Sequence, residues 1–580
     1  MERYALKHGD AFRVSVTEKE IAPGIEIVHL TADAVEDPQK LTVSVSRMIP
    51  DIGVHALWSP TGYHCKTVMP NWGPFFGSCA MSGAPVMAAL DYQDRNRITL
   101  ACSDVKNGVW MHTGLVEETG CLDTVVKIDV DYPVAHYEAD IRIDTRGDIP
   151  FYRAVQDVAA WWETYEGLAP APVPLDAKMP LYSAWYSYHQ MIDVDAIVEE
   201  CRRFSEIGCR VLIVDEGWQT DDNNRGYAFC GDWQPSHKKI PDMREFVRAV
   251  HDTGMKFMLW YSVPFVGENS EAYARFRDKL LCPMGDGFHA LDPRFPEVRR
   301  HLIDLYKNAV LAWDLDGFKL DFVDAFRQAD AVREGMDCVS VYDGVDRLLK
   351  GVMAELRAIK PDILIEFRQS YMGPLMRTFG NLIRVVDCPC DSYTNRMGAL
   401  SLRMTSGNTA VHSDMVMWNY DETPEQAAFQ LTNVLFCVPQ ISVKWSLMSE
   451  GQRKMVSAFC ALWLKYRDVL MNGTLTCRGY ANNFPYVSAR LDDVQVGAVY
   501  AGRIAALEAP TSEVVLVNAS LDCVIYVECA ERVSYQYTVY DCMGEMCGEG
   551  SVSVSACVPG VIGGVPVNGT VVMKKTDVCE

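Results

Sequence analysis

The sequence predicts a multidomain α/β protein in which a central (β/α)8 TIM barrel is flanked by an N-terminal β-sandwich and a C-terminal β-sandwich. Two observations lead to this prediction. Strand-like runs alternate with helical segments between residues 182 and 445, whereas short strands separated by turn residues fill both ends of the chain. The length of 580 residues also exceeds what one hydrophobic core usually supports, so two or three domains are expected.

The N-terminal part of the chain reads as an all-β domain. Residues 11–165 contain short alternating runs, such as those at 40–49 and 137–145, broken by Gly, Pro and Asn. A proline-rich connector at 169–175 marks the first boundary. We therefore expect a β-sandwich over residues 1–168.

Beyond this connector the pattern changes to strands that alternate with helices. Strands are expected at 182–188, 210–218, 256–262, 317–322, 362–367, 382–387, 409–414 and 440–445, and helices at 193–208, 243–254, 298–313 and 345–359. Helical sequence continues to about residue 469, and short Val-rich runs follow it. We therefore expect the barrel over residues 176–471 and a second β-sandwich over residues 472–580.

Composition excludes several classes of function. The net charge of -23 disfavours nucleic acids and anionic membranes as partners, because both require a basic face. The chain lacks a run of about 18 apolar residues and an apolar signal segment, so a cytoplasmic location is expected. The 20 cysteines lack the spacings of a zinc site or a disulfide framework, which suits a reducing compartment. The expected partner is a neutral small molecule, and formation of a homo-oligomer stays open.

Acidic residues collect at the expected carboxyl ends of the barrel strands, which is where barrel active sites lie. They end the second, fourth, fifth, sixth and seventh strands, the last together with a histidine: Asp215, Glu216, Asp321, Glu366, Asp387, His412 and Asp414. A single such residue is usually a helix N-cap. Several carboxylates at one mouth repel one another, so the group is expected to serve either a divalent metal or a carboxylate pair that performs acid/base and nucleophilic work.

The fourth expected strand carries a second charged residue. In its sequence, GFKLDF, apolar and polar positions alternate, so Lys319 and Asp321 lie on the same face of the strand. A buried carboxylate is costly without a partner, and Lys319 provides one. Taken alone, this pair is also consistent with a structural ion pair.

Four stretches resemble glycoside hydrolase family 36, the melibiase-type α-galactosidases. They are LIVDEGW at 212–218, residues 231–264, LDPRFPEVRRHL at 291–302 and GFKLDF at 317–322. The last is similar to the family's nucleophile strand. The order of β-sandwich, barrel and β-sandwich also matches the family, so the resemblance extends over nearly the whole chain, although it is specific only from about Val211 to Arg396.

The resemblance implies roles for individual residues. Asp321 is the expected nucleophile, and Lys319 is expected to contact sugar hydroxyls. In relatives an acidic pair at the positions of Asp215 and Glu216 holds the C4 and C6 hydroxyls, although Glu216 stands where the family commonly has a second Asp. Asp387 matches the first aspartate of the family's sixth-strand pattern and is the expected acid/base.

Two further departures from the family pattern bear on this assignment. RVVDCPCDSYTNR at 384–396 replaces the usual sixth-strand segment, so Asp391 competes with Asp387 for the acid/base role. EFRQSYMGP at 366–374 replaces a Gly-rich segment after the fifth strand, and Arg368 is expected to alter the pocket around C2 of the sugar.

The chemistry explains why two carboxyl groups are needed. A retaining glycosidase requires one ionised carboxylate and one protonated carboxyl group, about 5 to 5.5 Å apart. Lys319 is expected to keep Asp321 ionised, whereas the less compensated setting of Asp387 should let its pKa rise. The two groups would then hold the different protonation states that the reaction requires.

Further residues are expected to contact the substrate or to line the mouth. These are Trp218, Trp233, Trp260, Glu366, Asp391 and His412. The tryptophans have core or rim packing as an equally weighted alternative to stacking on a sugar. Trp72, in NWGP at 71–74, is expected either to cover the mouth of its own or a neighbouring subunit, or to belong to an ordinary turn.

The sequence therefore predicts a retaining exo-α-galactosidase that needs no metal and no organic cofactor. Within enzymes, the alternatives are action on another α-glycoside, such as an N-acetylgalactosaminide or a glucoside, and transglycosylation. The alternative from a different class is a catalytically silent sugar-binding barrel. The presence of both Asp321 and Asp387 argues against silence.

Overall fold

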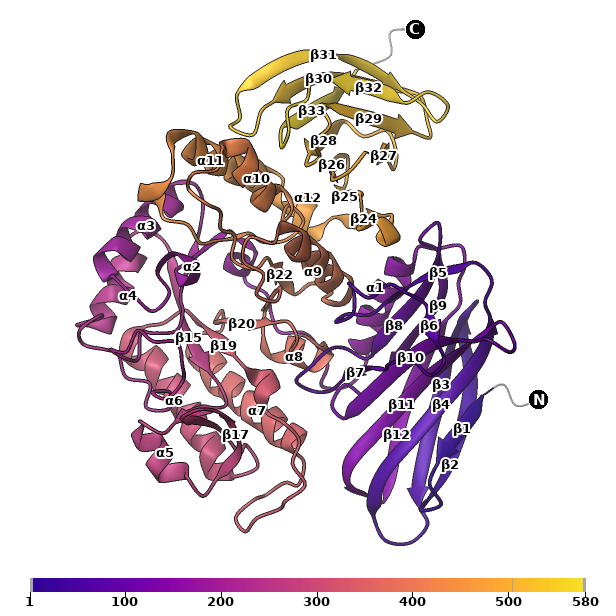
Figure 1. Cartoon of the computed structure of the whole chain (residues 1–580), viewed down its shortest axis with the longest axis vertical. Helices are drawn as coiled ribbons and strands as arrows, with labels where there is room; N and C mark the ends of the chain where they lie inside the picture. Colours follow the sequence, from indigo (N-terminus) through magenta and orange to yellow (C-terminus); the bar gives the residue numbers. More distant parts are fainter. Residues whose placement is uncertain (1–3, 503, 577–580) are drawn as a thin grey trace.

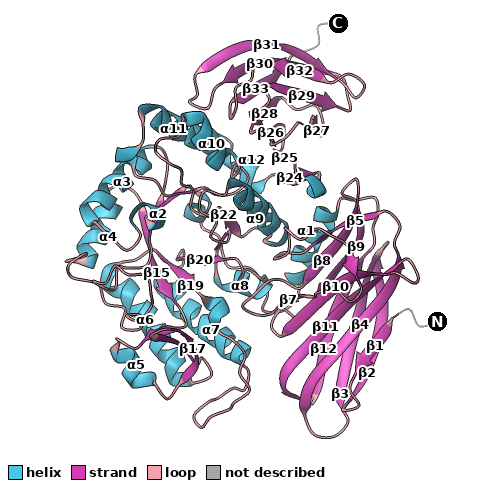
Figure 2. Ribbon diagram, in the orientation of Figure 1, coloured by secondary structure: helices cyan, strands magenta, loops and turns pink. Residues whose placement is uncertain are grey.

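The computed structural model describes residues 4–502 and 504–576. A strand-rich body forms the N-terminal part, a barrel with surrounding helices forms the centre, and a second strand-rich body forms the C-terminal part (Figures 1 and 2). The predicted fold class is therefore confirmed. None of the helices in the described ranges combines the length and the apolar character that crossing a bilayer requires.

Two antiparallel-rich sheets of six strands each form the N-terminal body. Their orders are β1-β4-β11-β10-β6, with β7 paired to β10, and β2-β3-β12-β9-β8-β5. The strands are β1 (Ala5–His8), β2 (Phe12–Ala22), β3 (Ile25–Ala34), β4 (Gln39–Pro50), β5 (Val54–Trp58), β6 (Met69–Pro70), β7 (Phe76–Ser78), β8 (Val86–Asp91), β9 (Asn96–Cys102), β10 (Gly108–Val116), β11 (Cys121–Val134) and β12 (His136–Asp144). Alternate residues such as Val28, Leu30, Val43 and Ile128 are buried in one core between the sheets, as the period of two requires.

Helix α1 (Phe151–Trp162) follows the first body and packs against β8 and β9. The indole N–H of Trp162 donates to the carbonyl of Cys102, 2.8 Å away, which fixes the helix to the end of β9. The connector then forms a short 3-10 turn, η1 (Leu175–Lys178), beneath the barrel.

Eight parallel strands form the barrel in the order β22-β21-β20-β19-β15-β14-β13-β23. They are β13 (Leu181–Ser183), β14 (Val211–Val214), β15 (Lys256–Ser262), β19 (Gly317–Asp321), β20 (Leu364–Arg368), β21 (Leu382–Arg384), β22 (Ala410–His412) and β23 (Gln440–Ile441). A parallel bridge between His412 and Val438 brings the two end strands together and nearly closes the barrel. Each of the eight expected strands overlaps one observed strand.

The first barrel strand is shorter than expected. It ends at Ser183, and Trp185–Tyr188 forms helix α2 instead of continuing the strand. Trp185 and Tyr188 are both buried, and their spacing of three places them on one helical face, so tertiary packing overrides the strand preference of aromatic residues.

Helices cover the outside of the barrel. They are α3 (Val194–Glu206), α4 (Met243–His251), α5 (Glu271–Phe276), α6 (Pro296–Trp313), α7 (Val341–Ile359), α8 (Pro374–Phe379), α9 (Ser392–Thr405), α10 (Pro424–Thr432), α11 (Glu450–Lys465) and α12 (Arg467–Asn472), with 3-10 turns η2 (Val323–Ala325) and η3 (Trp445–Leu447). Strands β16 (Phe265–Gly267), β17 (Leu280–Gly285) and β18 (Phe288–Leu291) form a small separate sheet. Asp193 and Asp242 accept hydrogen bonds from the first turns of α3 and α4, which explains why these helices begin where they do.

The C-terminal body has a seven-stranded sheet, β24-β25-β26-β28-β33-β30-β31, and a three-stranded sheet, β27-β29-β32. Its elements are β24 (Thr474–Arg478), η4 (Tyr480–Asn482), β25 (Tyr486–Leu491), β26 (Val494–Val499), β27 (Ala505–Leu507), β28 (Glu513–Asn518), β29 (Val524–Cys529), β30 (Val533–Tyr540), β31 (Met546–Val554), β32 (Gly560–Gly563) and β33 (Thr570–Lys575). The domain limits of 1–168, 176–471 and 472–580 stay predictions.

Candidate active site

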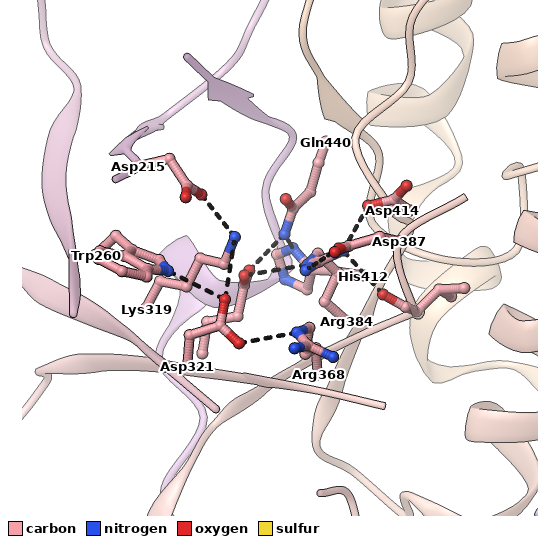
Figure 3. A network of polar contacts seen from close by, with 12 residues as sticks. Asp215, Trp260, Lys319, Asp321, Arg368, Arg384, Asp387, His412, Asp414 and Gln440 are labelled. Atoms are coloured by element: carbon pink, nitrogen blue, oxygen red, sulfur yellow. Dashed lines mark hydrogen bonds and ion pairs between the residues drawn. The ribbon is translucent and has the colours of Figure 1, made fainter. Parts of the chain in front are cut away.

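Asp321 is the last residue of β19, and its carboxylate lies at the centre of a polar network (Figure 3). Its side chain is 8% exposed. Oδ1 accepts hydrogen bonds from Arg368 Nε at 2.8 Å and from the Tyr371 hydroxyl at 2.6 Å, and Oδ2 accepts one from Trp260 Nε1 at 3.0 Å. Burial would raise the pKa of Asp321, but Arg368 and Lys319, with these hydrogen bonds, hold it well below its usual range. The carboxylate is therefore ionised, as expected.

Lys319 and Asp215 form a buried ion pair beside Asp321. Lys319 Nζ lies 2.6 Å from Asp215 Oδ2 and 3.9 Å from Asp321 Oδ2. Burial would lower the pKa of Lys319, but the neighbouring carboxylates, Asp215 above all, outweigh it and raise the pKa. The ammonium group thus joins the end of β14 to the end of β19 in one charged cluster.

Glu216 lies in the same mouth with a different partner. Its Oε1 accepts a hydrogen bond of 3.0 Å from the neutral amide of Gln190. Burial, together with the charge of Asp215, raises the pKa of Glu216 to about 7. Glu216 is therefore largely protonated below neutral pH.

Arg384 is a buried cation at the end of β21 that the sequence analysis did not identify as a site residue. Its guanidinium donates to Asp414 through Nη1 and to Asp387 through Nη2, the latter at 2.8 Å. Its Nε lies 3.5 Å from Oε1 of Glu366. Carboxyl groups from three strand ends thus meet on one guanidinium. Figure 3 labels two of them, Asp387 and Asp414.

Asp387 sits at the solvent side of this cluster, where its side chain is 55% exposed. The surrounding protein desolvates the carboxyl group and would raise its pKa, but the charge of Arg384, followed by Lys319 and Arg368, lowers it. The expectation of a raised pKa for Asp387 is therefore wrong. The sequence analysis missed Arg384, which compensates this aspartate from three residues earlier in the chain.

Asp391, the competing acid/base candidate, has a structural contact. Its Oδ1 accepts a hydrogen bond of 2.9 Å from the backbone N–H of Thr394, and its Oδ2 accepts one of 2.6 Å from the hydroxyl of that residue. These bonds make Asp391 the N-cap of α9. In the free protein, both of its oxygens are therefore engaged by Thr394.

His412, Gln440 and Glu366 form a buried layer under the mouth. His412 Nε2 donates to the carbonyl of Ala177 at 2.7 Å, which leaves Nδ1 to accept from Gln440 Nε2 at 3.3 Å. Burial lowers the pKa of His412 to about 4, so the ring is neutral. Gln440 also donates to Glu366, whose pKa burial raises. The structure places His412 and Glu366 in support of the site, because both are almost completely buried.

The expected stacking tryptophans pack against one another. Trp218 is 0% exposed and donates from Nε1 to the carbonyl of Trp260 at 2.9 Å. The rings of Trp218 and Trp233 are 6.0 Å apart, and those of Trp233 and Trp260 are 5.8 Å apart. The stacking role is therefore wrong for Trp218, which belongs to the barrel wall. Trp260 lies in the site through its hydrogen bond to Asp321.

Trp72 lies in the loop between β6 and β7 of the N-terminal body. Its exposed fraction is 80%. A role as a cover over the mouth, in its own or a neighbouring subunit, stays a prediction.

Tyr371 and Gln190 are two further contacts that sequence reasoning missed. Tyr371 is in the EFRQSYMGP stretch, in which Glu366 and Arg368 were the expected site residues. Gln190 lies just after α2, beyond the end of the expected first strand. It reaches Glu216 because the chain forms α2 there instead of continuing as a strand. A polar or aromatic side chain just beyond a barrel strand was the available signal.

Fold and site together define a (β/α)8 barrel with carboxyl groups gathered at the carboxyl ends of its strands (Figure 3). Comparisons with known proteins show what the chain is similar to. Residues 176–291 match the family model described as melibiase. The chain is 30% identical over 117 residues to alpha-galactosidase 1 of Pediococcus pentosaceus, a match that covers 20% of this chain and 14% of that protein. A match to the A type blood alpha-D-galactosamine galactosaminidase of Flavonifractor plautii is 23% identical over 185 residues and covers 27% and 15% of the two chains.

Solved structures extend the likeness to the whole fold. The crystal structure of a variant of the α-galactosidase AgaA from Geobacillus stearothermophilus, in complex with raffinose, has a TM-score of 0.66 and 13% sequence identity over 99% of this chain and 83% of that chain. In sequence, AgaA is 26% identical over 156 residues, 25% of this chain and 21% of that protein. The sequence matches thus span about a fifth or less of these curated relatives. The resemblance to glycoside hydrolase family 36 is confirmed.

Proposed function

We propose that this chain is a retaining, exo-acting α-glycosidase whose best simple substrate carries a terminal α-linked galactose. One observation carries the proposal: Asp321 is a buried, ionised carboxylate at the end of a barrel strand, held by side chains from the neighbouring strands. An ionised carboxylate beside an anomeric carbon is what nucleophilic catalysis requires.

In this proposal Asp321 attacks the anomeric carbon and Asp387 acts as the acid and then the base. Asp387 is ionised in the free protein, because Arg384 lowers its pKa. A sugar in the mouth would displace water from the exposed Asp387 side chain, and the loss of water favours the protonated form. After the leaving group departs, the ionised form of Asp387 is suited to take a proton from water.

The glycone is recognised by a charged acceptor, Asp215, at the end of β14 and a charged donor, Lys319, in β19. Asp215 and Lys319 hold each other at 2.6 Å and present fixed polar groups to ring hydroxyls, with Glu216 beside them. Hydrogen bonds to an axial C4 hydroxyl would select the galacto over the gluco configuration. The curated relatives named as α-galactosidases and the raffinose complex of AgaA support this choice.

Other α-glycosides are the alternative. The relative named as a galactosaminidase, together with Arg368 near the expected C2 pocket, supports an α-N-acetylgalactosaminide as the second candidate. Transglycosylation needs only that a sugar hydroxyl replaces water in the second step. A cytoplasmic location and action without a metal or organic cofactor are part of the proposal and rest on the sequence alone.

A panel of nitrophenyl α- and β-glycosides tests the function directly with the purified chain. We expect the largest kcat/KM for the α-galactoside. A larger value for an α-glucoside or an α-N-acetylgalactosaminide would reject galactose but keep the mechanism, and no turnover of any member would reject the enzyme.

The variant Asp215→Asn sharpens the assignment of the glycone. It removes a charged acceptor, so kcat/KM for the α-galactoside should fall by about 30-fold, equivalent to about 2 kcal/mol or more. The same variant should discriminate less between α-galactoside and α-glucoside. Equal losses of kcat/KM for the α-galactoside and the α-glucoside would show that Asp215 does not distinguish the configuration at C4.

A further inference from the structure

The two oxygens of the Asp321 carboxylate have different surroundings. Three donors converge on Oδ1: the Tyr371 hydroxyl at 2.6 Å, Arg368 Nε at 2.8 Å and the backbone N–H of Phe322 at 2.8 Å. The N–H of Phe322 belongs to the peptide unit that directly follows Asp321, and it donates to the side chain of that residue. Because a carboxylate oxygen offers about two lone pairs, these donors saturate Oδ1.

Oδ2 is less engaged. It accepts a hydrogen bond of 3.0 Å from Trp260 Nε1 and lies 3.9 Å from Lys319 Nζ. Figure 3 shows one oxygen of Asp321 directed toward Lys319 and Trp260 and the other toward Arg368. Oδ2 therefore faces the ion pair with Asp215 that is proposed to hold the glycone, and it keeps a lone pair for bonding.

We propose that Tyr371 and Arg368 are positioning residues that occupy Oδ1 of Asp321, so that Oδ2 is the oxygen that bonds to the sugar. This inference rests on the proposed function and deepens it. Tyr371 is almost completely buried, and its ring also packs against the guanidinium of Arg368, with 5.3 Å between them. The two donors thus hold each other as well as the carboxylate.

The N-terminal body supports this arrangement. The backbone N–H of Gly83, in the loop before β8, donates to the carbonyl of Ser370 at 2.8 Å. The hydroxyl of Ser370 donates to Asp324 at 3.1 Å. The residue before Tyr371 is therefore fixed from two sides, which limits how far the phenol can move from Asp321.

The reaction follows from these positions. A lone pair of Oδ2 forms a bond to the anomeric carbon while the electrons of the glycosidic bond move to the leaving oxygen, which takes a proton from Asp387. Water then attacks the anomeric carbon, its proton goes to Asp387, and the electrons of the sugar–Oδ2 bond return to Asp321. Donors on Oδ1 stabilise the carboxylate that is released, so they speed the second step more than the first.

The variant Tyr371→Phe separates the two steps. With 2,4-dinitrophenyl α-galactoside, whose leaving group needs no proton, stopped-flow absorbance should show a burst of about one dinitrophenolate per active site. Steady-state kcat and KM should both fall by about tenfold, as expected for one lost hydrogen bond to a charged group, so kcat/KM should change little. A merely structural role would lower kcat/KM and give no burst.

Two variants control the result. Tyr261→Phe removes the hydroxyl of another fully buried tyrosine, one that has no hydrogen-bond partner within the described part of the chain, and should leave kcat, KM and burst unchanged. Arg368→Lys keeps the charge but loses the Nε donor, and it should change kcat and KM in the same direction as Tyr371→Phe.

Three outcomes decide between the proposals. The positioning role would be overturned if Tyr371→Phe showed no burst and unchanged kcat and KM. It would also be overturned if the variant lost kcat/KM tenfold without a burst. If the wild type prefers another glycoside of the panel, its dinitrophenyl form replaces the galactoside, and only the galactose assignment fails. If the wild type cleaves none, the proposed function fails. The positioning role is then decided by NMR, from the pH titration of the 13C carboxyl signal of Asp321. The signal is assigned by its loss in Asp321→Asn. The midpoint of this titration must be higher in Tyr371→Phe than in the wild type.

Discussion

Two carboxylates of the barrel mouth, at the ends of β19 and β21, are built in opposite ways. Asp321 is 8% exposed and is held by donors from β15, from β20 and from the segments that follow β19 and β20. The Asp387 side chain is 55% exposed and contacts the single guanidinium of Arg384. Both have a lowered pKa. Asp321 therefore has a fixed position and stays ionised. Asp387 is exposed, so a bound ligand can change its hydration.

This difference matches the two tasks of a retaining glycosidase. A nucleophile works best with a fixed position and a constant charge. An acid/base has to gain and lose a proton in each cycle, so it needs an environment that changes. The contrast between burial and exposure supports the proposed roles of Asp321 as nucleophile and Asp387 as acid/base.

Removal of the buried carboxylate, Asp321, should have the largest effect. Asp321→Ala should lower kcat/KM for the preferred glycoside by about 10⁴-fold or more. Added azide or formate should restore part of the activity, because a small anion can take the place of the lost nucleophile. Labelling of another carboxylate by a mechanism-based fluorosugar, with Asp321 unmodified, would contradict the assignment.

The loss of rate on removal of the exposed carboxylate, Asp387, should depend on the leaving group of the substrate. Asp387→Ala should reduce the rate by about 10² to 10⁴-fold for raffinose, whose leaving group needs a proton, and by much less for a dinitrophenyl glycoside. Steady-state kinetics with both substrates measure the contrast.

Asp391→Ala is the matched control, since it changes the same residue type four positions away. It removes the N-cap of α9, so it should lower the free energy of unfolding by about 1 kcal/mol and leave activity unchanged. Selectivity for the leaving group in Asp391→Ala, or in Glu216→Gln, would move the acid/base role to that residue.

Glu216 extends the comparison to a carboxyl group whose hydrogen-bond partner is a neutral amide. Its pKa is about 7 in the folded chain, above the ordinary value of 4.5. Below pH 4.5 the group is protonated in both states. Between pH 4.5 and 7 the unfolded chain releases the proton first, so the wild type loses stability as pH rises, by about 3 kcal/mol in total.

Glu216→Gln should abolish this loss. The unfolding midpoint of the variant, followed by tryptophan fluorescence, should exceed that of the wild type by a margin that grows from pH 4.5 to pH 8. The exposed Glu334→Gln provides the control, with no such growth expected. A constant margin for Glu216→Gln would mean that this carboxyl group is ionised throughout the range.

The barrel was predictable from sequence because its determinants are local. Parallel strands buried on both faces read as apolar runs, and amphipathic helices with aspartate caps separate them, as at Asp193 and Asp242. The same periodicity placed Lys319 and Asp321 on one face and at a strand end. These features depend on residues that are neighbours in the chain.

The protonation states and the supporting contacts depended on the tertiary structure. Arg384 and Asp414 are 30 residues apart in sequence, and Tyr371 and Asp321 are 50 apart, yet each pair is joined by a hydrogen bond. The pKa of a carboxyl group is set by charges and water within a few ångströms, whatever their distance along the chain. The sequence by itself determined which carboxylates reach the barrel mouth; only the packing of the strand ends decided that Arg368 and Tyr371 hold Asp321, that Arg384 keeps Asp387 charged, and that Trp218 is buried in the wall.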